Sequence, residues 1–177
     1  MGTPVCWSNT TDYVSTLSGI DRTHQIDLTD LADGAVRQGA KADLGANRAG
    51  GYAVKACIEM ASAPTAGEPI EIYWSSSVSA SAGTGNDGGA DTTGADGAWA
   101  PGGGAEADID EWKRHLTLIG VMPLTADAEL QVKTINTYFS PPTRYGQILI
   151  KNGGGVAMQA DAVEMYVALI PITDDAA

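Results

Sequence analysis

Basic residues are scarce in this chain of 177 residues, and no long hydrophobic run is present. Lys and Arg number 10 against 22 Asp and Glu, which gives a net charge of −12. Nucleic acids and anionic membranes both attract basic surfaces, so we expect neither as a partner. No apolar run approaches the roughly 18 residues that a membrane-spanning helix needs. Residues 1–20 also lack the basic stretch and apolar core of a secretory signal peptide, so none is expected.

Cysteines and aromatic residues are few as well. Cys6 and Cys57 lie far apart in different surroundings, and without a secretion signal we expect two free thiols instead of a disulfide or a metal pair. Aromatic residues make up 6% of the chain, whereas Ala and Gly number 27 and 22. Small side chains bury little area each, so the core must depend on a few segments.

Those segments alternate apolar and polar residues with a period of two, which is typical of strands buried on one face. They cover residues 26–31, 52–60, 69–74, 114–122, 130–139, 145–151 and 162–172. Gly, Pro and Asn turn signals separate them, and no helical period intervenes. The pattern predicts an all-β protein, an antiparallel, jelly-roll-like β-sandwich that occupies residues 26–177 as a single domain. Residues 1–25 are polar and aperiodic, which predicts an extended N-terminal arm that does not pack.

A Gly/Asp-rich stretch at residues 75–111 interrupts the strands. No Lys or Arg occurs between Lys55 and Lys113, and ten acidic residues lie in that window. The stretch cannot bury enough apolar area to fold by itself, and loops of this length are usually functional or disordered. The acidic loop is therefore predicted to face solvent or to meet a basic patch on a neighbour.

Residue chemistry gives little sign of catalysis. Asp87, Asp91 and Asp96 could supply oxygen ligands for Ca²⁺, but they lack the regular spacing and terminal Glu of an EF-hand, so we expect a solvated acidic loop. His24 and His115 have no ligand partners at metal spacing. Nucleophile-elbow and phosphate-loop motifs are absent from the sequence. We therefore expect no catalytic residues, no cofactor and no metal, and the chain is predicted not to be an enzyme.

Two tryptophans in polar surroundings raise the question of a partner. Trp99 lies in the Gly-rich stretch and Trp7 in the expected arm. A large aromatic side chain must bury itself, so each either folds back onto its own sandwich or anchors a partner. The candidate partner-binding residues are Trp7, Trp99, Asp87, Asp91 and Asp96.

Several segments together are similar to a known class of protein. They are 28–31, 40–49, 63–67 leading into 70–75, 142–146 and 160–164, with the Gly/Asp-rich loop between them. Over residues 26–172 the chain resembles small β-sandwich structural proteins of tailed-bacteriophage virions. The resemblance implies a non-enzymatic capsid decoration (cement) protein of a virion assembled in the host cytoplasm. It would bind the major capsid protein or other virion proteins through its arm and loop, as a homo-oligomer.

Two alternatives stay open. A tail-associated or carbohydrate-binding β-sandwich module would use Trp99, Tyr145 and Tyr166 as sugar-stacking surfaces. A Ca²⁺-dependent hydrolase on the same fold would use the acidic loop.

Overall fold

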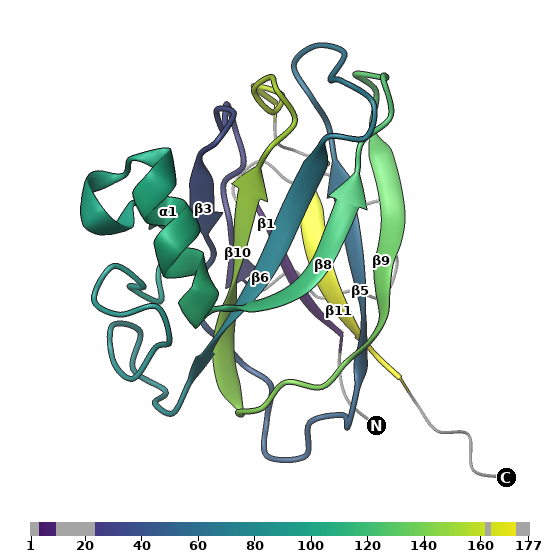
Figure 1. Ribbon diagram of the computed structural model, residues 1–177. Helices are drawn as coiled ribbons and strands as arrows, with labels where there is room; N and C mark the ends of the chain where they lie inside the picture. Colours follow the sequence, from purple (N-terminus) through teal and green to yellow (C-terminus); the bar gives the residue numbers. More distant parts are fainter. Residues whose placement is uncertain (1–3, 10–23, 162–163, 173–177) are drawn as a thin grey trace, which may run out of the picture.

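The computed structural model describes residues 4–9, 24–161 and 164–172, which form two packed β-sheets (Figure 1). The first sheet has the order β2 (His24–Gln25), β1 (Val5–Ser8), β11 (Tyr166–Pro171), β5 (Tyr52–Ile58) and β9 (Gln131–Phe139). The second has the order β7 (Gly97–Ala98), β3 (Val36–Gln38), β10 (Tyr145–Asn152), β6 (Pro69–Ser77) and β8 (Thr117–Pro123), and β4 (Ala42–Asp43) also pairs with β10. The pairs are antiparallel except β1 with β2, which is parallel. The predicted β-sandwich is confirmed, and its likeness to a jelly roll stays a prediction.

The core between the sheets follows from the period-two alternation of the sequence. Val54, Ala56 and Ile58 of β5 point inward and are fully buried. Ile72 of β6 belongs to the same apolar cluster from the opposite sheet. Trp74 is buried at the centre, with edge-on ring contacts to Trp7 and Phe139. A few large side chains therefore fill the interior of a chain that is rich in Ala and Gly.

The N-terminal segment corrects one prediction. Val5–Ser8 is not an unpacked arm, because it pairs with β11 in the register Val5↔Leu169 to Ser8↔Tyr166. Trp7 is 0% exposed. A strand of four residues is too short for its alternation to show in the sequence, and it is stabilised by a long-range partner. The rest of the predicted arm includes residues 10–23, which lie outside the described part of the chain.

Other predicted bounds also change. Residues 26–31 form irregular chain with a turn instead of a strand, with Asp30 at a positive φ of 52°, although Ile26 and Leu28 are buried as the alternation suggested. Strand β8 begins at Thr117, because Lys113–His115 form a short 3-10 helix. Cys6 and Cys57 are buried, and no disulfide joins them.

The loop predicted at residues 75–111 is an ordered segment over residues 78–116, hereafter the 78–116 segment, because β6 extends to Ser77 and β8 begins only at Thr117. It contains β7, a 3-10 turn at Pro101–Gly103, the helix α1 (Glu106–Trp112) and the 3-10 turn before β8. Trp99, Ile109 and Leu116 of the segment form a second apolar cluster with Val36, Tyr73 and Leu149 of the sheet. The segment thus covers the outer face of β3, β10 and β6 (Figure 1). No helix in the described part of the chain is long and apolar enough to cross a membrane.

Side chains close the gap between the edge strands β8 and β9. Asn136 Nδ2 donates to Ile119 O at 2.8 Å, and Lys133 Nζ donates to Pro123 O. Gly120 lies directly beneath Ile135, where a Cβ atom would come within 2.5 Å of the Ile135 side chain. Edge strands left open invite pairing with another chain, and this edge is blocked by its own neighbour.

Candidate functional site

Buried polar side chains on the outer face of the second sheet hold the 78–116 segment in place. Gln38 Nε2 donates to Asp91 O (2.9 Å) and Ala98 O (3.2 Å), while Gln38 Oε1 accepts from Thr93 N (2.8 Å) and from Gln147 Nε2 (3.0 Å). Backbone groups of the segment that would otherwise need water are therefore satisfied by the sheet. The sheet beneath the 78–116 segment therefore helps to order the segment, in addition to the segment's own residues.

Lys41 organises the first turn of the segment. Its ammonium group donates to Ser77 Oγ at 2.9 Å and to the carbonyl oxygens of Ser79 (3.2 Å), Ser81 (2.6 Å) and Thr84 (3.0 Å). Burial lowers the pKa of Lys41. A single cation thus gathers four oxygens of a turn that has few apolar contacts of its own.

The two candidate tryptophans lie inside the protein. Trp99 is 1% exposed, and its Nε1 donates to Thr92 Oγ1 at 3.1 Å. Trp7 Nε1 donates to Ala40 O at 2.7 Å. Both tryptophans fold back onto their own sandwich, and neither presents an exposed ring to a partner. The prediction of Trp7 and Trp99 as anchors is corrected accordingly, because the chain's own sheets provide the pockets that bury them.

The three candidate aspartates have different roles. Asp96 accepts from Arg37 Nε (2.8 Å) and Nη2 (2.7 Å) and from the backbone N–H of Asp27 (3.1 Å). Its hydrogen bond raises the pKa of Arg37. Asp87 and Asp91 are exposed, and their backbone carbonyls, not their carboxylates, accept from the sheet. Over the described residues, no group of three or more His, Cys, Asp or Glu is placed to hold a metal.

An ion-pair network fastens α1 to the strands. Asp110 Oδ1 lies 2.9 Å from Lys113 Nζ and 2.8 Å from Lys151 Nζ, and Lys113 Nζ lies 3.1 Å from Glu71 Oε2. Hydrogen bonds from Lys151 and Lys113 lower the pKa of Asp110. The Lys151 side chain is nine-tenths buried and pairs with the carboxylates of Asp110 and Glu106, which balance its charge.

Glu71 also orients a buried tyrosine. Tyr73 donates its hydroxyl proton to Glu71 Oε2 at 2.8 Å. Burial, and secondly the hydrogen bond to Glu71, raise the pKa of Tyr73 to about 12. The phenol therefore stays protonated at neutral pH and acts as a fixed donor.

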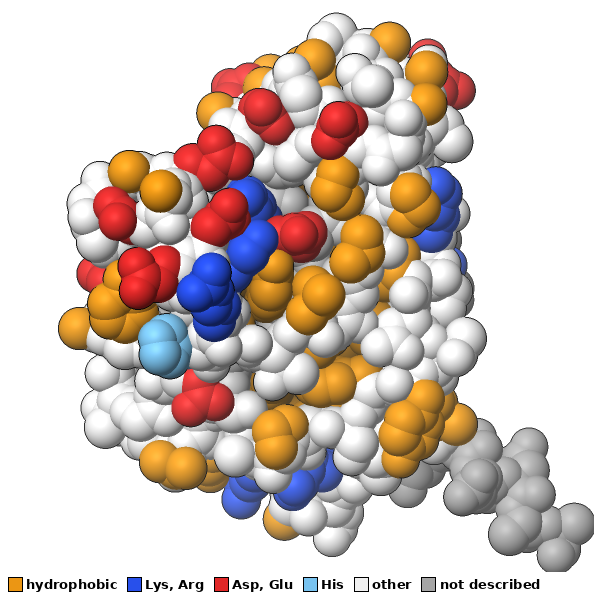
Figure 2. All heavy atoms as spheres, in the orientation of Figure 1, with side chains coloured by type: hydrophobic (Ala, Val, Ile, Leu, Met, Phe, Trp, Pro, Cys, Tyr) orange, Lys and Arg blue, Asp and Glu red, His pale blue; other side chains and the backbone are white. Residues whose placement is uncertain are grey.

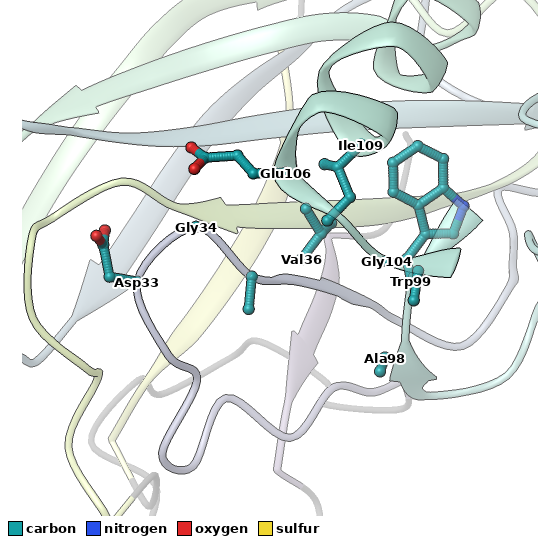
Figure 3. A pocket seen from close by; sticks show the side chains of 10 residues that line it. Asp33, Gly34, Val36, Ala98, Trp99, Gly104, Glu106 and Ile109 are labelled. Carbon is teal, nitrogen blue, oxygen red and sulfur yellow. The ribbon is translucent and has the colours of Figure 1, made fainter. Parts of the chain in front are cut away.

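Beside this network lies a groove with an apolar floor and a carboxylate rim. A pocket of about 260 Å³ has Val36, Trp99 and Ile109 among its lining residues, with Asp33 and Glu106 at one end (Figure 3). A second pocket of about 290 Å³ shares Asp33 and Glu106 and adds Glu68, Pro69, Glu71, Lys151 and Gly153. We call the two pockets together the acidic groove. Its rim carries four carboxylates against one lysine, so it favours a cationic group over an anion.

Sequence reasoning missed the acidic groove. Glu106 was visible as part of the acidic stretch, but Asp33 and Glu68 come from turns that are distant in sequence. Lys151 lies at the end of a strand, where nothing in the local pattern shows that it pairs with α1. No local signal could have joined these residues, because only the packing of α1 on β10 brings them together.

The aromatic residues considered for stacking on sugars are not arranged for that purpose. Trp99 and Tyr166 are buried, at 1% and 4% exposure. Tyr145 lies beneath Arg144, whose guanidinium carbon is 5.0 Å from the ring centroid. Two of the three residues in the sugar-stacking hypothesis are therefore buried in the protein interior.

No family model, curated protein or solved structure matches this chain. Its function has to be inferred from its residues and their geometry.

Proposed function

We propose that this protein is a non-enzymatic structural protein of a tailed-bacteriophage virion, a capsid decoration protein that binds the major capsid lattice. The observation that carries the proposal is the ordered 78–116 segment. It is fixed to the sheet by Gln38, Lys41 and the Asp110 ion pairs. A fixed, outward-facing acidic surface loses little conformational entropy on binding, which suits attachment to a rigid lattice.

The acidic groove defines the chemistry of that attachment. Glu106, whose side chain is 68% exposed, and Asp33 stand at the junction of its two pockets. Lys or Arg of a capsid subunit would place its alkyl stem over the apolar floor and its charge beside these carboxylates. Exposed charge pairs are screened by salt, so attachment would weaken as ionic strength rises.

Binding to particles tests the proposal. Particles stripped of this protein, or assembled without it, are mixed with the purified chain and sedimented at increasing salt. Cryo-electron microscopy then locates the added density. We expect salt-sensitive co-sedimentation and density on the capsid surface. Absence of the wild-type protein from sedimented particles at low salt would refute the proposal, and density on the tail would support the tail-associated alternative.

Paired variants test the role of the groove. Glu68→Gln and Glu106→Gln together remove two negative charges from its rim and should reduce attachment. Glu59→Gln, compared with each of those substitutions made singly, removes the same one charge at the end of β5, in the sheet that α1 does not cover. The Glu59 variant should bind as the wild type does. Equal loss in the single groove variants and in the Glu59 variant would point to net charge instead of the groove.

A further inference from the structure

Exposed apolar side chains concentrate on β8, β9 and the turn that joins them. Seven large hydrophobic residues are exposed in the described chain, and five belong to this region: Leu118 (50%), Val121 (41%), Leu130 (36%), Val132 (47%) and Tyr138 (62%). We call these five residues the β8–β9 face. Figure 2 shows hydrophobic side chains gathered over β8 and β9, whereas charged side chains gather around α1. Large exposed apolar regions often mark a binding surface.

The occupant of this face does not add a strand to the sheet. Ile119 and Pro123 direct their carbonyl groups toward β9, where the side chains of Asn136 and Lys133 already bind them. Proline also lacks the N–H that a pairing strand would need. The face therefore binds through side-chain packing.

The distribution of charge on the chain indicates which partner the β8–β9 face binds. The whole chain carries −12, but residues 117–139 contain only Asp127, Glu129 and Lys133, a net charge of −1. Two copies of the chain that meet through the acidic α1 side would repel each other. The β8–β9 face carries few charges of its own, with Glu71 opposite Val121 at its border, so two copies would repel each other less there than across the acidic groove.

Arg114 before β8 and Glu129 after it carry opposite charges, and Lys133 Nζ also lies at the Pro123 end of the strand. Arg114 and His115 precede the strand, and Asp127 and Glu129 follow it in the turn to β9. Arg114 and Glu129 form no ion pair within the described residues. A two-fold axis that sets two β8 strands antiparallel would bring Arg114 of each copy near Glu129 of the other. A two-fold contact uses the same patch on both copies, so an apolar centre with oppositely charged ends is self-complementary.

We infer that the β8–β9 face binds a second copy of this chain in a two-fold dimer, with the two β8 strands antiparallel across the contact. The inference does not depend on the proposed role in a virion. Packing of Leu118, Val121 and Val132 supplies the apolar centre, and the Arg114–Glu129 pairs fix the orientation.

Sedimentation equilibrium of the full chain at micromolar concentration tests this inference. We expect a dimer for the wild type. Leu118→Ser and Tyr138→Ser should each raise the dimer dissociation constant at least about tenfold, equivalent to about 1.4 kcal/mol. The matched control is Val78→Ser, at a residue that is 82% exposed but lies in the 78–116 segment. Circular dichroism shows whether each variant has kept its fold.

Charge exchange tests the orientation. Arg114→Glu and Glu129→Arg should each weaken the dimer, and the two substitutions in one chain should restore it, because the pair is then re-formed with reversed signs. A monomeric wild type would overturn the inference, as would a trimer or a dimer insensitive to the serine substitutions. Failure of the double variant to recover would overturn the antiparallel arrangement. None of these outcomes requires particles, so the result is separate from that of the capsid-binding experiment.

Discussion

Replacing Trp99 by alanine separates the two roles that a tryptophan in this segment can have. Its indole is 1% exposed and packs in the second apolar cluster, which includes Val36, Ile109 and Leu149. Its Nε1 donates to Thr92 Oγ1 at 3.1 Å. The substitution removes both the packing and the hydrogen bond from the place where the 78–116 segment meets the sheet.

The magnitude follows from the area involved. A buried tryptophan removes about 150–250 Å² from water, worth about 4–6 kcal/mol at roughly 25 cal/mol per Å². Substitution of buried tryptophan by alanine typically costs about 3–5 kcal/mol, because the site partly collapses. Loss of the hydrogen bond to Thr92 contributes about 1 kcal/mol of that cost. Since the second cluster is distinct from the main core, the first consequence should be local opening of the segment.

Hydrogen exchange and urea unfolding provide the assay. For Trp99→Ala we expect faster exchange at residues 92–112, with the amides of β5 and β11 less affected, and a free energy of unfolding lowered by about 3 kcal/mol or more. Val78→Ala serves as the control, because that side chain is 82% exposed in the same segment. If Trp99→Ala exchanged and unfolded like the wild type, Trp99 would not hold the 78–116 segment on the sheet.

Three further predictions concern the sheets and their ion pairs. Gly146→Ala should cost at least about 2 kcal/mol in a denaturation assay, because a Cβ there would collide with the buried indole of Trp74. Asp96→Asn removes the charge that pairs with Arg37 and should lower the free energy of unfolding by about 1.5–3 kcal/mol, measured at neutral pH. Asp110 has a lowered pKa in the folded state, so its contribution is present above its ordinary pKa of 3.8 and is lost as the pH falls through the lowered pKa. Asp110→Asn should therefore reduce the acid-induced loss of stability, measured by denaturation across that pH range.

The strands of the core could be predicted from the sequence because one face of each is buried. Tyr52–Ile58 and Tyr145–Asn152 lie within one or two residues of their predicted bounds. Ile26–Leu31 alternates equally well, yet it forms a turn, because burying Ile26 and Leu28 does not require strand pairing. Alternation therefore predicted which residues are buried more reliably than it predicted hydrogen bonding.

Order in the 78–116 segment could not be predicted, because its causes lie in other parts of the chain. Gln38 lies outside every predicted strand and Gln147 within one, and glutamine is a residue type that is usually exposed. Both are buried beneath the segment, where Gln38 binds the backbone of the segment and Gln147 Nε2 donates to Gln38 Oε1. Lys41 looks like an ordinary surface lysine in the sequence, but its ammonium binds the turn at residues 79–84. Polar side chains that satisfy a distant backbone leave no periodic signal.

The acidic groove and the β8–β9 face occupy different parts of one side of the sandwich, over α1 and over the β8–β9 edge (Figure 2). In a dimer formed through the β8–β9 face the two acidic grooves would lie beside the contact, because Glu71 of each groove pairs with Val121 of β8. Two grooves held in fixed relation can bind two sites of a repeating lattice at once, which can strengthen attachment by about 100-fold or more without any new contact. Such a gain requires lattice sites whose spacing matches that of the two grooves. The two proposals are thus independent in their evidence but cooperative in effect: a monomeric variant would still bind through one groove, only more weakly.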